Sequence, residues 1–522
     1  MHALLSELSP VSPDDPEPLK YDPPRLYTRR MWTLEQELAE RLGRKYRQPV
    51  ELPDEASVRA RISQLFKGTS AEDVDWQRVA VAHALRHALT VLTGGPGTGK
   101  TTTVTRLLVA LAALSARPVA MALAAPTGKA AQRLTESIIG QKQRLLNEGV
   151  DAQLLRAIPE EACTVHRLLG VRGGSGGFIH GEDKPLDLDV LVVDEVSMLD
   201  LPLMTALFRA LPDKTRVILI GDPDQLPAVG VGGILAELVR EPDEHYLKDD
   251  ASWIEAVTGQ TVPVSTHVGA PWHTALYHSR RFDPGSGIGR LARALQNGQL
   301  ALAADILANP PAEDLCWHPL WEAQTLLDAG KSHWRRLLQA KTPDEAFEAL
   351  KTFRVLTPLR QGPWGVEQLN PLIEQHLGVG AGTASGPWYQ GRPIMVTRNH
   401  YGVGLFNGDV GLIWEQDGQK VALFESESGT GYRTFPVHRL PEVETVFAMT
   451  IHKTQGSEFD EVLMLLPEDA ERLLSRELIF TGLTRAKRRL TLLASADVWQ
   501  TGVERRIERE GGLRQALERV LR

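Results

Sequence analysis

The chain has 522 residues, of which 42% are hydrophobic and 24% are charged, and its formal net charge is −8. This length predicts several domains, and the acidic balance excludes a protein that holds nucleic acid by bulk positive charge. No apolar run is long enough to span a membrane, no secretory leader is evident, and Cys163 and Cys316 exclude a disulfide scaffold. We therefore expect a cytoplasmic protein with no membrane segment.

Two segments are predicted ahead of the main domains. Residues 1–24 contain six prolines with acidic residues between them, which is typical of a linker or a loosely ordered arm. From 25 to 70, apolar residues recur at helical spacing between Leu26 and Leu38. We expect these residues to form a short helical lead-in domain.

Residues 71–265 are expected to form a first α/β domain. Apolar runs of strand length alternate there with helical segments; the runs are 89–92, 119–124, 190–193 and 217–220. Such runs are typical of a parallel sheet covered by helices on both faces, and ligands bind at the carboxyl ends of its strands. His83 and His87 have the spacing of metal ligands on a helix, but their apolar neighbours favour a packed helix.

A second α/β domain is expected from 266–385 and 441–522. Residues 386–440 interrupt it with a different pattern, in which short strand-like runs alternate with turn signals such as Asn407-Gly408 and Asp417-Gly418. The runs are 391–396, 408–414 and 420–425. This pattern predicts a small antiparallel barrel inserted into the second domain.

The strongest motif follows the first apolar strand. It reads GGPGTGKT from 94 to 101 and stands before a helical run, which is the context that a P-loop requires. Its backbone N–H groups would wrap phosphates, Lys100 would reach the β- and γ-phosphate oxygens, and the Thr101 hydroxyl would bind Mg²⁺. The motif therefore predicts a site for ATP and Mg²⁺. The expected nucleotide contacts are Gly94, Gly95, Gly97, Thr98, Gly99, Lys100, Thr101 and Thr102.

Two later strand ends carry residues suited to phosphoryl transfer. Asp194 follows the run 190–193, where it can help to hold Mg²⁺, and Glu195 beside it is the candidate that polarises the attacking water. Gln225 lies in a turn after the next strand, and its amide can donate to the γ-phosphate and accept from the water. Taken alone, the Asp194-Glu195 pair could be a solvated strand end and the turn with Gln225 could be purely structural. Together with the P-loop, the two motifs indicate ATP hydrolysis.

With these motifs in place, the chain resembles the RecD family of superfamily 1 DNA helicases from about residue 25 to its carboxyl end. The run DWQR at 75–78 is similar to the family's Q motif. The other matching motifs are APTGKAA at 125–131 (Ia), TVHRLLG at 164–170 (Ib), SRRF at 279–282 (IV), AMTIHKTQGSEF at 448–459 (V) and FTGLTRAK at 480–487 (VI). The resemblance implies two RecA-like motor domains, a short 1B hairpin near 171–187, an inserted SH3-like barrel (2B) and a short helical amino-terminal region.

The resemblance also assigns roles to residues of these motifs. Gln77 would read the adenine edge, and Glu458 would contact the ribose hydroxyls. Arg281 and Arg485 would reach the γ-phosphate from the second domain, so that hydrolysis depends on closure of the cleft between the domains. The contacts to single-stranded DNA would be made through phosphates or stacking. They would come from Thr127, His166, Thr450, His452 and Lys453.

The resemblance finally implies an ATP-dependent helicase that moves 5′ to 3′ along single-stranded DNA and unwinds duplex DNA. It would be the RecD-type subunit of a recombination and repair complex acting at double-strand breaks, in a heterotrimer with RecB-like and RecC-like subunits. No nuclease site is evident in this chain, so strand cutting would belong to a partner. Two alternatives stay open: a stand-alone helicase of the same family, and a nucleotide-gated DNA-binding subunit that does not unwind.

Overall fold

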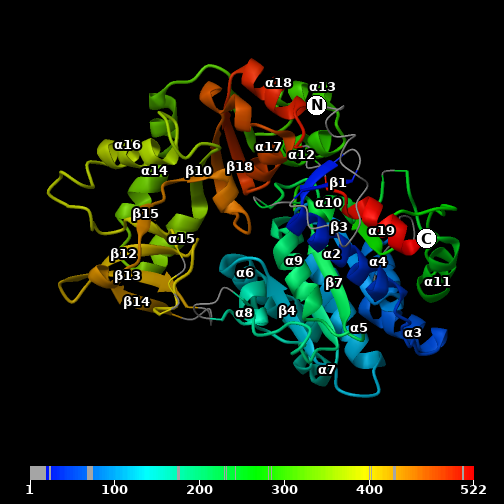
Figure 1. Ribbon diagram of the computed structural model, residues 1–522. Coiled ribbons are helices and arrows are strands. Elements are labelled where there is room, and N and C mark those ends of the chain that lie inside the picture. Colours follow the sequence, from blue (N-terminus) through cyan, green and yellow to red (C-terminus); the bar gives the residue numbers. More distant parts are fainter. Residues whose placement is uncertain are drawn as a thin grey trace.

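The structure is a computed structural model that describes residues 19–22, 25–67, 74–172, 177–228, 230, 232–241, 243–279, 281–283, 285–398, 400, 402–426, 431–507 and 511–522. The described chain forms two lobes, each built on a parallel β-sheet, and an antiparallel sheet lies beside the second lobe (Figure 1). None of its described helices is long and apolar enough to cross a membrane.

The first lobe contains a parallel sheet of six strands in the order β5-β4-β6-β7-β3-β8. The predicted apolar runs form its central strands, because residues buried on both faces of a sheet must be apolar along their whole length. The strands are β3 (Leu89–Gly94), β4 (Met121–Ala125), β5 (Ala162–Thr164), β6 (Val190–Val193), β7 (Arg216–Gly221) and β8 (His273–Leu276).

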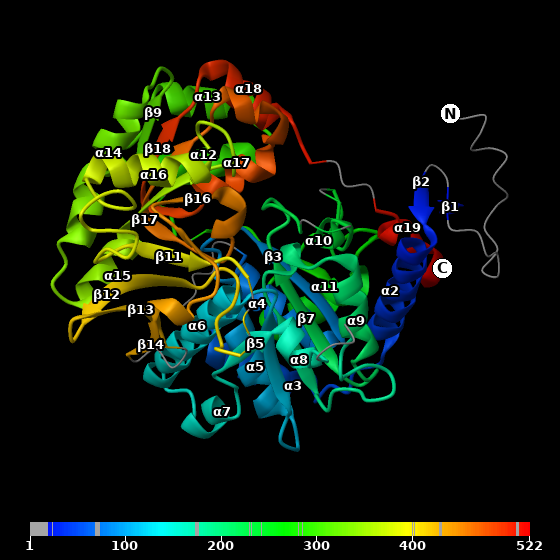
Figure 2. The ribbon, with the colours of Figure 1, turned by 60° about the vertical axis from the view of Figure 1, so that its left-hand side comes forward.

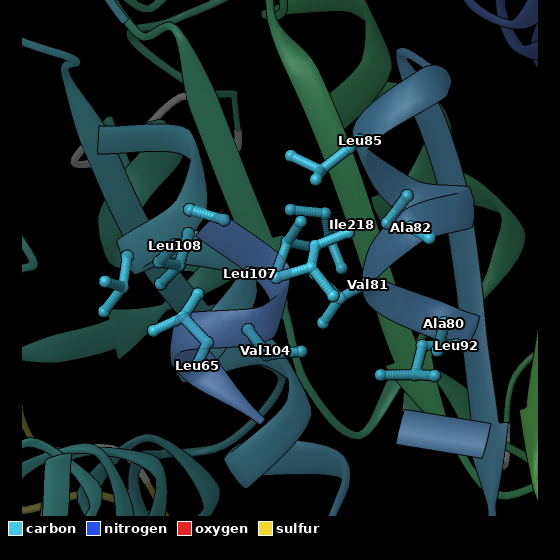
Figure 3. Close-up of a cluster of buried hydrophobic side chains, with 14 of the residues drawn as sticks. Leu65, Ala80, Val81, Ala82, Leu85, Leu92, Val104, Leu107, Leu108 and Ile218 are labelled. Atoms are coloured by element: carbon cyan, nitrogen blue, oxygen red, sulfur yellow. The ribbon is translucent and has the colours of Figure 1, made fainter. Parts of the chain in front are cut away.

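Helices cover both faces of this first sheet. On one face, Leu65, Val81 and Leu107 from three helices meet Leu92 and Ile218 of the sheet (Figure 3). These helices are α3 (Glu55–Leu65), α4 (Trp76–Arg86), α5 (Lys100–Leu114), α6 (Gly128–Asn147), α7 (Ala152–Arg156) and α11 (Lys248–Thr258). The opposite face is covered by α2 (Arg29–Arg47), α8 (Val165–Leu169), α9 (Leu201–Arg209), α10 (Ile234–Glu237) and α19 (Leu513–Leu521).

The second lobe contains a parallel sheet of five strands in the order β16-β10-β17-β18-β9. The strands are β9 (Leu315–His318), β10 (Phe353–Thr357), β16 (Ala448–Thr450), β17 (Phe459–Leu465) and β18 (Ala486–Leu493). One face is covered by α12 (Gly287–Gln296), α13 (Leu300–Ala308), α17 (Arg476–Leu483) and α18 (Ala496–Glu504). The other face is covered by α14 (Ala323–Leu338), α15 (Pro343–Thr352) and α16 (Val366–Leu377).

An antiparallel sheet in the order β14-β13-β12-β11-β15 lies within the second lobe's sequence. Its side chains point alternately to a small core of its own around Ile413 and to the core of the second lobe around Leu412. The strands are β11 (Pro393–Val396), β12 (Val410–Gln416), β13 (Gln419–Glu425), β14 (Tyr432–Pro436) and β15 (Val443–Thr445). Closure of this sheet into an SH3-like barrel stays a prediction.

Several expected boundaries differ from the observed elements. Residues 19–22, expected in the proline-rich arm, form β1 (Leu19–Asp22), which pairs with β2 (Arg25–Thr28). Residues 1–18 and 23–24 of that arm lie outside the described residues. Helices α2 and α3 pack on the first sheet and do not form a separate lead-in domain. The sequence does not mark such a boundary, because the apolar face of an amphipathic helix predicts that the face is buried but does not identify the element that packs on it.

The division between the two α/β domains also differs from the expected one. Strand β8 belongs to the first sheet although it lies after residue 266, and β15 joins the antiparallel sheet although it lies after residue 440. Helix α19 returns from the second lobe to the first and lies beside α2 (Figure 2). Its residues Leu513, Ala516 and Leu517 enter the core of the first lobe there. The chain therefore crosses between the lobes twice.

Candidate nucleotide and DNA site

The P-loop connects the end of β3 to the start of α5. Gly97 and Gly99 have φ angles of 77° and 87°, a region that side chains with a Cβ rarely adopt. The Lys100 ammonium donates to the carbonyl oxygens of Gly94 at 2.5 Å and Gly95 at 3.1 Å. Because α5 begins at Lys100, its unpaired N–H groups and its positive dipole end face the loop, which suits bound phosphate.

Gln77 holds the other side of this loop. Its Nε2 donates to the Thr98 carbonyl oxygen at 3.0 Å, and a Cβ on Gly99 would lie only 2.2 Å from that nitrogen. The Gln77 Oε1 atom is buried and has no hydrogen-bond partner. A buried amide oxygen without a donor is costly, and the exocyclic amine of adenine is a donor that would satisfy it. This side chain therefore fits the base of ATP.

The end of β6 brings two carboxylates to the P-loop. The Glu195 N–H donates to Asp194 Oδ1 at 2.8 Å, and Glu195 itself has a φ of 52°, which is rare for a residue other than glycine. Burial, together with the neighbouring charge of Glu195, raises the pKa of Asp194 to about 6, and Lys100 acts in the opposite direction. The Asp194 carboxylate after β6 and the Thr101 hydroxyl at the start of α5 lie at the same edge of the first sheet, and oxygen donors of this kind fit Mg²⁺.

A hydrogen-bonded chain crosses from the first lobe to the second at Gln225. Its Nε2 donates to Asp222 Oδ2 at 2.9 Å, and its Oε1 accepts from Arg485 Nη2 at 3.0 Å. The Arg485 guanidinium is 2% exposed and also donates to the carbonyl oxygens of Thr481 at 3.0 Å and Ser457 at 3.2 Å. Burial lowers the pKa of Arg485 to about 10 and raises the pKa of Asp222.

Arg281 and Glu458 meet at the same cleft together with Arg133, a residue that sequence reasoning missed. Glu458 Oε1 accepts from both Arg133 Nη2 and Arg281 Nη2. Burial and the charges of Arg133 and Arg485 lower the pKa of Arg281 to about 9. The expected contact between Glu458 and ribose stays a prediction, because in this structure the carboxylate is paired with two guanidinium groups.

Further contacts close the cleft around the P-loop. Ser279 Oγ donates to the Pro96 carbonyl oxygen at 2.7 Å, and a Cβ on Gly97 would lie 2.2 Å from the Arg281 Cβ. Gln296 Nε2 donates to Asp224 Oδ2 at 2.9 Å. Neither Ser279 nor Gln296 was expected as a cleft residue, since hydrogen bonds between distant segments leave no local signal.

The expected DNA contacts lie along the carboxyl edges of the two sheets, outside the nucleotide cleft. Thr127 follows β4 and caps α6 by accepting from the Ala130 N–H at 3.2 Å. His166 lies on α8, after β5, with its ring 6.0 Å from that of Phe178. In the second lobe, Thr450 ends β16, and the Lys453 ammonium donates to Glu444 Oε1 at 2.8 Å. His452 lies between them in the short 3-10 helix Ile451–Thr454.

The order of strands separates these two groups of residues. Strands β5 and β4 are the outer strands at one side of the first sheet, whereas the nucleotide residues follow β6, β7 and β3. Parallel strands end at one edge, so both groups lie on that edge but on different strands. Within the expected 1B hairpin, Val171 pairs with Phe178 and the Arg172 N–H donates to the Gly177 carbonyl oxygen at 2.9 Å; residues 173–176 lie outside the described residues.

The His83 and His87 pair gains a third candidate ligand in the fold, Asp250 on α11, and their ligand atoms all lie within 4.8 Å of one another. These groups already have other partners, however. His83 Nε2 lies 3.1 Å from the Pro271 carbonyl oxygen, and Arg86 Nε lies 3.4 Å from Asp250 Oδ1. The Arg86 guanidinium beside the Asp250 carboxylate opposes a bound cation, and burial lowers the pKa of His83 well below its usual value. The cluster therefore joins α4 and α11 through an ion pair and hydrogen bonds.

Comparison with known proteins agrees with this geometry. Residues 77–231 match the family model described as an AAA domain, and residues 445–493 match the UvrD-like helicase C-terminal domain. The RecBCD enzyme subunit RecD of Haemophilus influenzae is 38% identical over an alignment of 538 positions, and the alignment covers 96% of this chain and 81% of that protein. The RecBCD enzyme subunit RecD of Mycolicibacterium smegmatis is 40% identical, over 87% of this chain and 76% of that protein.

A third relative carries a different name. The ATP-dependent RecD2 DNA helicase of Deinococcus radiodurans is 31% identical over 83% of this chain and 50% of its own length. The matches to RecD subunits span most of both chains, and the P-loop, the strand-end carboxylates and the arginines of the second lobe meet in one cleft. This chain therefore belongs to the RecD family of ATP-dependent DNA helicases.

Proposed function

We propose that this chain is a 5′-to-3′ single-stranded DNA translocase and helicase that binds Mg²⁺-ATP between its two lobes and works with RecB-like and RecC-like subunits in recombination and repair. The observation that carries the motor is the hydrogen bond from Arg485 of the second lobe to Gln225 of the first. Through this bond Gln225, the expected sensor of the γ-phosphate, is joined to the second lobe, which would move when the cleft closes. The two relatives named as subunits of the RecBCD enzyme support the partners.

The chain's own residues would divide the hydrolytic step among them. The Lys100 ammonium would leave the Gly94 and Gly95 carbonyl oxygens for the phosphates, and Glu195 would accept a proton from the attacking water. Arg281 and Arg485 would neutralise charge that develops on the γ-phosphate. Thr101 and Asp194 would hold Mg²⁺, which when bound neutralises phosphate charge and orients the nucleotide.

Movement along DNA would follow from closure and opening of the cleft. Thr127 and His166 stand on the first lobe, and Thr450, His452 and Lys453 stand on the second. When the cleft closes, the two groups approach each other, and alternating grips would move the strand from one group to the other. The antiparallel sheet would act as the SH3-like 2B domain, and the hairpin around Val171 and Phe178 would act as the 1B element that meets the duplex.

The alternative with support is a helicase that works without partner subunits. The similarity to the ATP-dependent RecD2 DNA helicase favours it, since that protein is named for its own activity and not as a subunit. Identity is higher to the RecBCD subunits and extends over more of their length, which favours the subunit reading.

The test is unwinding by the purified chain of duplexes that bear either a 5′ or a 3′ single-stranded tail, with ATP and Mg²⁺. Lys100→Gln is the control, because it removes the cation that meets the phosphates. We expect unwinding from the 5′ tail only, with none in the control variant. If the chain hydrolyses ATP with DNA stimulation but unwinds only after RecB-like and RecC-like subunits are added, it is an obligate subunit; absence of any DNA stimulation would contradict the motor itself.

A further inference from the structure

Helix α6 connects the predicted DNA contact to the nucleotide cleft. Thr127 caps its first turn, and two residues further along it face the loop 455–458 of the second lobe. Ala130 contacts Gly456, with its Cβ 3.5 Å from the position of a Cβ on that glycine, and Arg133 pairs with Glu458. Residues three apart share a helix face. One face of α6 therefore carries both contacts, beginning at the turn that Thr127 caps.

Glu458 pairs both with Arg133 of this helix and with Arg281, the arginine that is expected to reach the γ-phosphate. A single oxygen, Oε1, accepts from both Arg133 and Arg281, and the Glu458 side chain is only 12% exposed. The backbone of Arg281 packs on Gly97 of the P-loop, where a Cβ on that glycine would lie 2.8 Å from the Arg281 nitrogen. The contacts thus run without a break from α6 through Glu458 and Arg281 to the phosphate loop.

The shared carboxylate creates an electrostatic problem that Arg133 solves. If Arg281 turned to a bound γ-phosphate and Glu458 had no other partner, a mostly buried carboxylate would lose its counter-charge, which is strongly unfavourable. Arg133 already donates to the same oxygen, so Glu458 stays neutralised when Arg281 leaves. Without Arg133, Glu458 would retain Arg281 and oppose its transfer.

We propose that Arg133 is a positioning residue of the ATPase, which takes over the charge of Glu458 so that Arg281 can turn to the γ-phosphate, and which makes this exchange depend on DNA held at the start of α6. The proposal rests on the proposed function, because it assumes that ATP and single-stranded DNA bind where they are expected. It deepens that function by naming the path through which DNA stimulates hydrolysis.

The test compares ATP hydrolysis by the full chain with and without oligothymidylate in the wild type, Arg133→Met, Arg133→Lys and the double variant Arg133→Met/Glu458→Gln. Arg144→Met, an exposed arginine on the same helix, is the matched control. We expect the DNA-stimulated kcat of Arg133→Met to be about tenfold lower than that of the wild type. The KM for ATP and the affinity for oligothymidylate should change less than about threefold. Arg133→Lys should be intermediate, since it keeps the charge but not the fork of the guanidinium.

The double variant distinguishes a role of Arg133 in releasing Arg281 from a role in the stability of the fold alone. Glu458→Gln removes the charge that Arg133 neutralises, so the stimulated kcat should recover most of the loss even if KM rises through a lost ribose contact. Persistent loss in the double variant with an unchanged melting temperature, or normal stimulation in Arg133→Met, would overturn the proposal. Absence of stimulation in the wild type would instead overturn the proposed motor. A fall in the unstimulated kcat of Arg133→Met that the double variant recovers would still support the role of Arg133.

Discussion

At the scale of single residues, the cleft depends on side chains that are buried and fully engaged. Arg485 donates hydrogen bonds to Thr481, Ser457, Gln225 and Thr484 at once, whereas a lysine ammonium has only three donors. We expect Arg485→Lys to lower kcat about 100-fold with little change in ATP binding, because the lost donor acts on charge that develops during hydrolysis. Steady-state ATPase assays and binding of a fluorescent ATP analogue measure the two effects.

The exposed Arg488, which lies on β18 three residues after Arg485, supplies the control for that substitution. Arg488→Lys should hydrolyse ATP at the wild-type rate. Equal losses in the two variants would show that the segment as a whole, and not the Arg485 fork, is sensitive to substitution.

Asp194 predicts a pH dependence of stability. Its pKa is raised to about 6 in the fold by burial and by Glu195, above the ordinary value of 3.8. The folded protein therefore binds more protons than the unfolded chain between these values, so this group contributes stability below about pH 4 that is lost as pH rises through 6. Without nucleotide or Mg²⁺, Asp194→Asn should be more stable than the wild type at pH 7 by up to about 3 kcal/mol, and the difference should shrink towards pH 4.

Chemical denaturation of both proteins at several pH values measures this difference. The variant should also lose ATP hydrolysis, because an amide is a weaker ligand for Mg²⁺. A stability difference that stays constant from pH 4 to pH 7 would mean that Asp194 is not the group that titrates.

A residue of the site could be predicted from the sequence only where it belongs to a local motif. Lys100, Asp194 and Gln225 each follow an apolar strand, and the strand ends of a parallel sheet meet at one edge, so their gathering follows from the pattern. Arg133 and Glu458 are 325 residues apart, and nothing local to either predicts their meeting. Gln225 was expected from its strand end, and the resemblance placed Arg485 at the γ-phosphate, but the hydrogen bond between the two side chains was not predicted.

At the scale of elements, the docking of α19 against α2 is open to test. Gly43 on α2 faces Val520, since an added Cβ would lie 2.5 Å from the Val520 Cγ1 atom. Gly43→Ala should therefore destabilise the protein by about 1–3 kcal/mol through overpacking. Gly140→Ala, on α6 where an added Cβ meets nothing within 4 Å, should stabilise it by about 0.5–1 kcal/mol.

Thermal unfolding of the two alanine variants checks this pair, because the same substitution in two helices isolates packing from helix propensity. Stabilisation by both would show that α19 does not dock on α2 in solution. Sequence analysis found the P-loop and four of the six strands of the first sheet, without β5 and β8. It assigned α19 to the second domain, because the amphipathic pattern of a helix carries no information on which lobe covers it.

At the scale of the whole molecule, a net charge of −8 limits how DNA is held. Lys453 is the one lysine or arginine among the proposed DNA contacts, and it is paired with Glu444. Few phosphates should therefore be neutralised, and the logarithm of the affinity for single-stranded DNA should fall with the logarithm of salt concentration with a slope shallower than about −2. Fluorescence anisotropy of labelled oligothymidylate from low to high KCl gives this slope. A steep slope would require basic contacts elsewhere on the surface.

The return of α19 to the first lobe determines how the two lobes can move. The chain passes from the first lobe to the second after β8 and passes back between α18 and α19. If both connections act as pivots, two bodies joined at two points keep a single rotation about the line through those points, whereas one tether would also permit twisting and separation. Each opening of the cleft would then retrace the same arc. A stepping enzyme gains from this constraint, because a fixed arc gives the same displacement of the strand for every ATP hydrolysed.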